Sequence, residues 1–255
     1  MAEIVSLDEL QNQSMLSMYG LVDRNASNEE VSHSPGISLI PTSKCCCKHK
    51  VTTVACLIEA INSVYDEKSP NHSNIWTERK AKIYEILNKI EFSPTELSKY
   101  IHFDSAIPYT RNLISTDHKN YTLLLLCWGA GRESKIHDHP CQGCFVRTIS
   151  GSIAESIYTV NANKEIVFSR SNTYPAGLTS FMNDTIGLHK IGNPDPTQGA
   201  VSMHLYVPPY ETCKIWQDAG VKMADAQEGR ICHYSEYGQR TANPCACSGN
   251  EMYYI

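Results

Sequence analysis

The sequence predicts a mainly β protein, in which an antiparallel barrel or jelly roll carries α-helices on its outside. From residue 109 onward the chain divides into short β-rich runs that are broken by Gly, Asn, Asp and Pro. Many short strands at close spacing are typical of antiparallel barrels and jelly rolls. Before residue 109, two segments repeat apolar residues at helical spacing, and their apolar stripes are expected to pack against the barrel.

The 255 residues allow one large or two small domains. We expect a disordered N-terminal extension over 1–50, a folded domain over 51–241 and a C-terminal tail over 242–255. The extension contains Cys45-Cys46-Cys47, which could form a metal or redox site. Adjacent cysteines lack the spacing that lets a turn close on a metal, so a cysteine-rich tail is the better interpretation.

The helical part of the folded domain is predicted over about 51–103. Apolar residues at helical spacing indicate one amphipathic helix over about 52–66 and a second from Trp76 to Ile90. A capping box, Ser93-Pro94-Thr95-Glu96, predicts a short third helix that ends near Ile101.

The barrel is predicted over about 109–215. Its candidate strands span 110–115, 121–128, 144–150, 153–159, 165–169, 178–182, 187–191 and 200–206. In the last strand Ser202, His204 and Tyr206 alternate strictly with apolar residues, so all three share one face. A row of Ser, His and Tyr inside a barrel indicates a function.

Charge and apolar runs exclude several classes of partner. A net charge of −5 argues against nucleic acid and anionic membranes. The start of the chain lacks the basic-then-apolar order of a secretory signal. The longest apolar run, Leu123 to Trp128, is far shorter than the roughly 20 residues that span a bilayer. We therefore expect a soluble, cytoplasmic protein whose 11 cysteines are reduced thiols.

Three histidines are candidate metal ligands. His137 and His139 are two residues apart, so both rings project from one face of a strand. His189 supplies a third imidazole. Three neutral imidazoles can hold a divalent ion and leave coordination positions open for substrate. These ligands alone do not distinguish zinc from iron, and a zinc-filled or empty barrel is an alternative.

The spacing around these histidines resembles the cupin β-barrels. Gly131, His137-x-His139 and Gly151 match the first cupin motif, and His189 with Asn193 matches the second. Where most cupins have a glutamate, this chain has Cys144. Loss of that anion leaves positive charge that a substrate thiolate could neutralise.

A narrower resemblance is to the cysteine dioxygenases and extends, in order, from about residue 76 to 241. The further matching blocks are Tyr109-Thr-Arg111-Asn-Leu-Ile, Cys127-Trp128-Gly129, Asn183-Asp-Thr-Ile-Gly-Leu-His189, Ser202-Met-His204-Leu-Tyr206-Val-Pro-Pro and, weakly, Tyr234-Ser-Glu-Tyr-Gly-Gln-Arg-Thr241.

This resemblance implies a cupin jelly roll and an enzyme that oxidises free L-cysteine with O₂ to L-cysteine sulfinic acid, toward taurine and sulfate. Fe(II) would be held by His137, His139 and His189, because activation of O₂ needs a redox-active metal. The resemblance also implies a monomer with small-molecule substrates and no nucleic-acid or membrane partner. Dioxygenation of another small thiol, 3-mercaptopropionate or cysteamine, is an alternative. A non-catalytic metal-binding cupin is another.

Arg111 matches the arginine that binds the substrate carboxylate in the family, and Tyr109 lies on the same strand face. A guanidinium fork fits a carboxylate. A surface arginine is the alternative interpretation. The related mercaptopropionate dioxygenases tend to lack this arginine.

Cys144 and Tyr206 match the pair that forms a thioether crosslink in animal-type members. They could instead be an ordinary buried cysteine and a core tyrosine. The resemblance also implies a relay in which Ser202 orients His204 and His204 orients the Tyr206 hydroxyl. These four residues are the candidate catalytic set.

Three further expectations concern the surroundings of this set. Val207-Pro208 stands where the family has a cis Ser-Pro bond. Cys213 matches a cysteine near the pocket mouth, and Cys141 is interpreted as an exposed loop cysteine. Trp128 is expected in the barrel core.

Overall fold

The computed structural model describes residues 50–66, 74–93 and 95–242. Its helices are α2 (Val54–Asp66) and α3 (Ile75–Asn88), with 3₁₀ turns η1 (Ser98–Tyr100) and η2 (Met223–Asp225). Its strands are β1 (Tyr109–Thr116), β2 (Thr122–Trp128), β3 (Ile136–His137), β4 (Gly143–Ser150), β5 (Ser152–Val160), β6 (Ile166–Pro175), β7 (Thr179–Met182), β8 (Leu188–Gly192), β9 (Ala200–Val207), β10 (Thr212–Trp216), β11 (Gln227–Arg230), β12 (Ser235–Glu236) and β13 (Gln239–Arg240).

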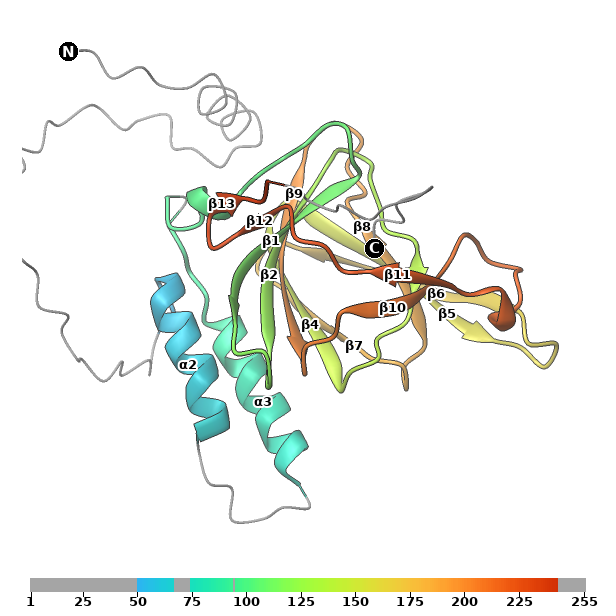
Figure 1. Ribbon diagram of the computed structural model, residues 1–255, viewed down its shortest axis with the longest axis horizontal. Helices are drawn as coiled ribbons and strands as arrows, with labels where there is room; N and C mark the ends of the chain where they lie inside the picture. The colour runs from blue at the N-terminus through green and yellow to red at the C-terminus, as the bar shows by residue number, and fades with distance from the viewer. Residues whose placement is uncertain (1–49, 67–73, 94, 243–255) are drawn as a thin grey trace, which may run out of the picture.

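Two sheets face each other and form the barrel (Figure 1). One has the strand order β13-β12-β1-β2-β9-β4-β7, and the other has the order β11-β10-β3-β8-β5-β6. The pairs are antiparallel except that of β1 with β12, which is parallel. The expected mainly β barrel with helices on the outside is therefore confirmed.

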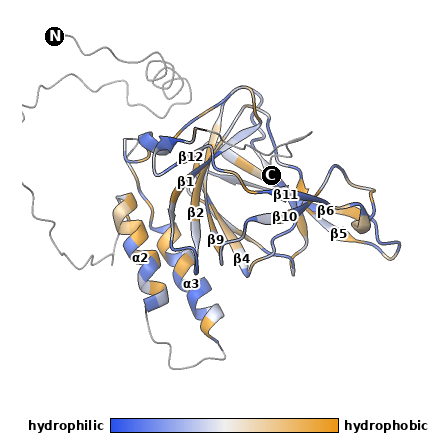
Figure 2. Ribbon diagram, in the orientation of Figure 1, coloured by the Kyte–Doolittle hydropathy of each residue, from blue (hydrophilic) through white to orange (hydrophobic). Residues whose placement is uncertain are grey.

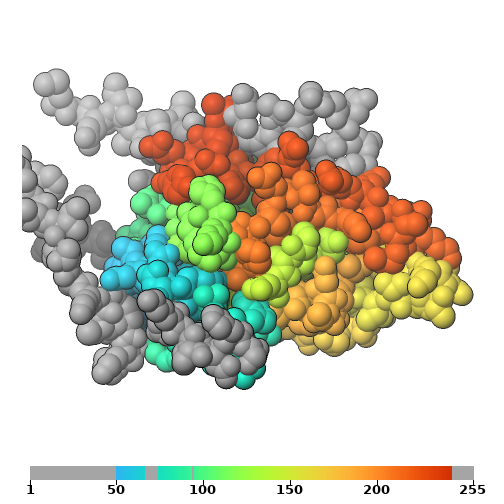
Figure 3. All heavy atoms as spheres, turned by 60° about the horizontal axis from the view of Figure 1, so that its bottom comes forward, coloured from blue at the N-terminus to red at the C-terminus, as the bar shows by residue number. Residues whose placement is uncertain are grey.

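The helices cover the outer face of the first sheet. Orange and blue positions alternate along α2 and α3 (Figure 2), as expected for amphipathic helices. The apolar side of α2 and α3 packs with Leu123, Leu125 and Met203 in one core cluster. The helical layer and the β5–β6 hairpin lie at opposite ends of the molecule (Figure 3). Because helices cover its outer face, β9 is buried on both faces and its inner face is free to carry polar residues.

The predicted third helix is wrong. Only the 3₁₀ turn Ser98–Tyr100 forms there. Glu96 does not complete a capping box with Ser93, whose hydroxyl pairs with that of Thr95 at 3.0 Å. The Glu96 carboxylate instead accepts a hydrogen bond of 2.7 Å from the backbone N–H of Val54, the first residue of α2. A tertiary contact therefore uses the carboxylate that a local cap would have needed.

The eight predicted strands are present, with β6 continuing to Pro175, but five strands were not predicted. Strands β3, β12 and β13 have two residues each, and β11 and β13 are mostly exposed. These four strands are too short or too exposed to show apolar alternation in the sequence, whereas the fifth, β10, buries Cys213, Ile215 and Trp216 and was missed despite that pattern.

Other expectations have mixed outcomes. The Val207–Pro208 bond is cis, as the resemblance implied. Cys232 is disulfide-bonded, so the expectation that every cysteine is reduced is wrong for this residue. Residues 1–49, with Cys45 to Cys47, and the tail from 243 lie outside the described residues.

Candidate metal centre and substrate site

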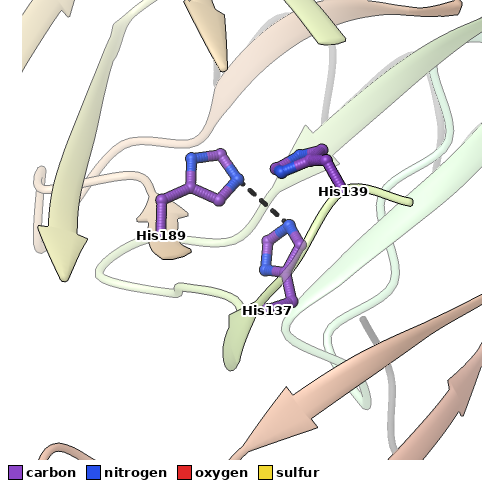
Figure 4. A group of neighbouring side chains, drawn as sticks. All are labelled: His137, His139 and His189. Atoms are coloured by element: carbon purple, nitrogen blue, oxygen red, sulfur yellow. Dashed lines mark hydrogen bonds between the residues drawn. The ribbon is translucent and has the colours of Figure 1, made fainter. Parts of the chain in front are cut away.

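The three predicted metal ligands converge inside the barrel (Figure 4). His137 on β3 and His189 on β8 are direct cross-strand partners. His139 was predicted to lie on one strand with His137, but β3 ends at His137. The ring of His139 nevertheless points toward the rings of His137 and His189. One ligand atom from each histidine lies within 4.8 Å of the others, and all three side chains are buried. The sequence pattern therefore located a real cluster.

The hydrogen bonds of the rings show that this cluster fits a cation. His137 Nδ1 lies 2.9 Å from the carbonyl of Lys135, and His189 Nδ1 lies 2.7 Å from a carboxylate oxygen of Glu155. A carbonyl and a carboxylate can only accept, so both Nδ1 atoms donate. The Nε2 atoms, 3.1 Å apart, are joined by the dashed line in Figure 4. In neutral rings these Nε2 atoms direct lone pairs at each other, and a divalent ion between them removes the repulsion.

The protonation of the ligands supports the same conclusion. Burial, and next the neighbouring His189, hold the pKa values of His137 and His139 well below the usual range. Neutral imidazole is the form that binds metals. His139 Nδ1 is buried and has no hydrogen-bond partner among the described residues. The residues present therefore fit a divalent metal.

The opposite sheet brings a chain of polar side chains to this cluster. Trp128 Nε1 donates a hydrogen bond of 2.8 Å to Ser202 Oγ, and Ser202 Oγ lies 2.8 Å from His204 Nε2. His204 Nδ1 lies 3.9 Å from Cys144 Sγ. Burial, and next the charge of Arg111, hold the pKa of His204 well below its usual value. His204 is therefore a neutral ring between a hydroxyl and a thiol.

Cys144 and Tyr206 lie opposite each other on β4 and β9. Burial is the main reason that the pKa values of the thiol and the phenol are raised well above their usual values, so both keep their protons. The ring of Tyr210 meets that of Tyr206 edge-on, with centroids 5.3 Å apart.

Arg111 on β1 is buried on the same side as Tyr109, whose ring centroid lies 5.3 Å from the guanidinium carbon. Neither the Arg111 Nε nor the Tyr109 hydroxyl has a hydrogen-bond partner among the described residues. The charge of Arg111 lowers the pKa values of His137 and His204, which places it near the metal cluster. A buried cation with an unused donor there is suited to bind an anion.

Comparison with known proteins agrees with this geometry. Residues 50–219 match the family model described as cysteine dioxygenase type I. The chain belongs to the cysteine dioxygenase type I family. The match begins at the helices, earlier than the resemblance in the sequence, and ends before the weak block at Tyr234 to Thr241.

The alignments with curated relatives span most of the length of each relative. Cysteine dioxygenase type 1 of Homo sapiens is 33% identical over 171 residues, which are 66% of this chain and 82% of the relative. The Bos taurus protein of the same name is 31% identical over 203 residues, 79% of this chain and 94% of the relative. Among solved structures, a double-stranded β-helix protein from Klebsiella pneumoniae is 14% identical with a TM-score of 0.38, over 48% of this chain and 89% of that one. The family model and the curated relatives confirm the predicted family and enzyme class.

A cavity of about 530 Å³ lies beside the phenols of this cysteine dioxygenase family member. Tyr206 and Tyr210 line it together with Leu113, Leu124 and Ile231.

Two further cysteines of the sequence analysis differ in burial. Cys213 is buried, whereas Cys141 is half-buried rather than exposed as expected. Within the described ranges, none of the helices is long and apolar enough to cross a bilayer.

Sequence reasoning missed three residues of the site. Trp128, expected only as core, also donates to Ser202. Tyr210 had no motif to mark it. Glu155 could have been noticed, because it is a charged residue between Ile153 and Ile157 on the inward face of β5, where the alternation predicts an apolar side chain.

Proposed function

We propose that this family member is an Fe(II)-dependent dioxygenase that oxidises L-cysteine to L-cysteine sulfinic acid. One observation carries the choice of substrate: Arg111 is a buried guanidinium with an unused donor beside the cluster of three imidazoles. The cluster fits a metal, and the guanidinium fits the carboxylate of an amino acid. In the reaction R–SH + O₂ → R–SO₂H, both oxygen atoms join sulfur and the thiol proton stays with the acid.

His137, His139 and His189 would hold the iron. Bound iron supplies the one-electron chemistry that O₂ needs to react with a closed-shell thiol. Imidazole ligands add no negative charge to a metal, so the site would keep the positive charge of the ion and favour a substrate that arrives as a thiolate. Cys144 stands where most cupins have a glutamate, and its thiol stays protonated because burial raises its pKa.

Arg111 would bind and orient the substrate carboxylate, with Tyr109 beside it. Hydrogen bonds between charged groups are worth about 1.5–3 kcal/mol each. Holding the carboxylate fixes the thiol of a small amino acid at one distance from the histidines. Cysteamine has no carboxylate and would lose this contact.

Tyr206 would donate a hydrogen bond to substrate or oxygen from a phenol that keeps its proton, since burial raises its pKa. A thioether to Cys144 would fix the ring, because it removes rotation about the tyrosine side chain. Trp128 donates to Ser202 Oγ, so the Ser202 hydroxyl proton would be free to go to His204 Nε2. In the tautomer in which Nε2 accepts from Ser202, the Nδ1 proton would point to the Cys144 sulfur.

The test uses the full chain loaded with Fe(II) without oxygen. Oxygen uptake is then followed with L-cysteine, 3-mercaptopropionate and cysteamine, and the product is identified by mass spectrometry with ¹⁸O₂. We expect fastest uptake with L-cysteine and two labelled oxygens in the sulfinate. Fully loaded protein without thiol-dependent uptake would contradict the proposal, and tight zinc binding without turnover would favour a non-catalytic role.

A further inference from the structure

A buried carboxylate stands directly behind one of the three histidines. Glu155 on β5 is 1% exposed, and its Oε1 lies 2.7 Å from His189 Nδ1. Strands β5 and β8 pair with Ile157 opposite His189, so Glu155 reaches the ring diagonally from two residues away. The register of the sheet therefore fixes this contact.

The three histidines have different partners at the nitrogen that faces away from the cluster centre. His137 Nδ1 donates to a neutral carbonyl, and the buried Nδ1 of His139 has no partner among the described residues. Of the three rings, only that of His189 meets an anion among the residues that the structure describes. A hydrogen bond to a carboxylate fixes the tautomer of a ligand histidine and raises its basicity more than a carbonyl does. His189 is thus the most basic of the three ligands and the strongest donor of an electron pair to a metal.

A buried carboxylate needs compensation. Taking an ion out of water costs several kcal/mol unless a partner of opposite charge is close. The ion-pair partner of Glu155 is His189, which is itself buried. A neutral imidazole offers one hydrogen bond and no charge, whereas an imidazole bound to a divalent ion carries positive charge toward the carboxylate.

We infer that Glu155 is a positioning residue that supplies, through His189, the negative charge absent at Cys144. The inference rests on the proposed metal-binding function and deepens it. A cation in the cluster feels the Glu155 carboxylate across one imidazole ring, while its open positions stay free for substrate. A carboxylate at the position of Cys144 would occupy one of them.

Tyr174 on β6 extends this arrangement outward. Burial, and next the charge of the nearby Glu155 carboxylate, raise the pKa of Tyr174. The phenol therefore keeps its own proton near the carboxylate. His189, Glu155 and Tyr174 therefore follow one another from the metal cluster outward. The last of them is half-buried on β6.

The test is the binding of Fe(II) and of the spectroscopic probe Co(II) to Glu155→Gln. Glutamine keeps the shape and can still accept from Nδ1, but it removes the charge. Glu133→Gln is the matched control, because Glu133 is exposed, pairs with Lys190 of the same strand as His189 at 2.7 Å, and does not touch a ligand. Circular dichroism of the metal-free proteins confirms that each variant folds.

We expect Glu155→Gln to raise the Fe(II) dissociation constant by about 10–100-fold and to shift the Co(II) absorption bands. Glu133→Gln should bind as the wild type does. Equal affinities and spectra in Glu155→Gln and wild type would overturn the inference while the proposed function stands. Wild-type metal binding without thiol oxidation would overturn the proposed reaction and leave the role of Glu155 intact. If Glu155→Gln does not fold, Glu155→Asp replaces it, because the shorter side chain withdraws the carboxylate from His189 Nδ1, and an unchanged dissociation constant and spectrum there overturn the inference.

Discussion

Cys144 on β4 is the direct cross-strand partner of Tyr206 on β9. Opposite residues in an antiparallel pair have Cβ atoms about 4.5–5.5 Å apart, so the sulfur can reach the ring without movement of the backbone. In iron-loaded protein that turns over L-cysteine with O₂, we expect a fraction of chains to lose two hydrogens and yield a linked peptide containing both residues. Intact mass and peptide mapping measure this fraction.

The crosslink should be absent from Cys144→Ser and present in Cys213→Ser, which removes another buried thiol. Loss of the restraint on the phenol should cost about 1 kcal/mol, or roughly fivefold in kcat. The same two-hydrogen loss in Cys144→Ser would contradict this pairing.

Metal loading should stabilise the fold, because the ion relieves the opposition of the His137 and His189 lone pairs. A ligand present at 100 times its Kd stabilises the folded state by about 2.7 kcal/mol. For a domain of this size that is a rise in Tm of roughly 5–10 °C. His189→Ala should abolish the rise, and exposed His118→Asn should keep it. Differential scanning fluorimetry with and without a chelator measures the shift, and an equal rise in His189→Ala would exclude this cluster as the metal site.

Arg111 should determine the preference for a carboxylate. Arg111→Gln should lower kcat/KM for L-cysteine about 10–100-fold, the equivalent of a charge-assisted hydrogen bond, and leave cysteamine oxidation nearly unchanged. Arg147→Gln is the control, because Arg147 is equally buried but bonds Asn88 and the Gly177 carbonyl on the outer face. An unchanged ratio of the two substrates in Arg111→Gln would remove the proposed contact.

The sequence was sufficient where local spacing determines position. His137 and His139, two residues apart, had to lie close together, and the alternation around His204 placed one row inside the barrel. His189 needed the resemblance as well, because nothing local relates it to residues 52 positions earlier. The family resemblance and the match to residues 50–219 agree on these elements.

The rest depends on register and tertiary contacts, which no local pattern encodes. Glu96 looks like part of a capping box but bonds α2, 42 residues away. Glu155 reaches His189 only because β5 pairs with β8 in one register. The exposed strands β11 and β13 follow from pairing rather than apolar patterning. A monomeric state and a cytoplasmic location stay predictions.

The contact between Glu96 and α2 should contribute to stability. Thr53 Oγ1 already accepts from the N–H of Cys56, and Glu96 satisfies the N–H of Val54. Removing a side chain that satisfies a helix N-terminus costs about 0.5–2 kcal/mol. Glu96→Ala should therefore lower the free energy of unfolding by about 1 kcal/mol in urea titration. Glu85→Ala, which breaks only an exposed pair with Lys89, should cost clearly less, because water screens an exposed ion pair. Equal losses in the two variants would show that Glu96 has no capping role.

The metal-free protein should lose stability as the pH falls below about 6.5, the usual histidine value. His204 is buried, and its pKa is held well below that value by burial and by Arg111. The unfolded chain therefore binds a proton that the folded chain does not, and the free energy of unfolding must fall as the pH decreases. One such group contributes a slope of at most about 1.4 kcal/mol per pH unit.

His204→Gln should reduce the slope between pH 6.5 and 5 by about that amount, measured by urea unfolding of the metal-free proteins. His118→Asn, at an exposed position, should leave the slope unchanged. An unchanged slope in His204→Gln would show that His204 takes up its proton in the folded state, and the neutral His204 between Ser202 and Cys144 would then be wrong.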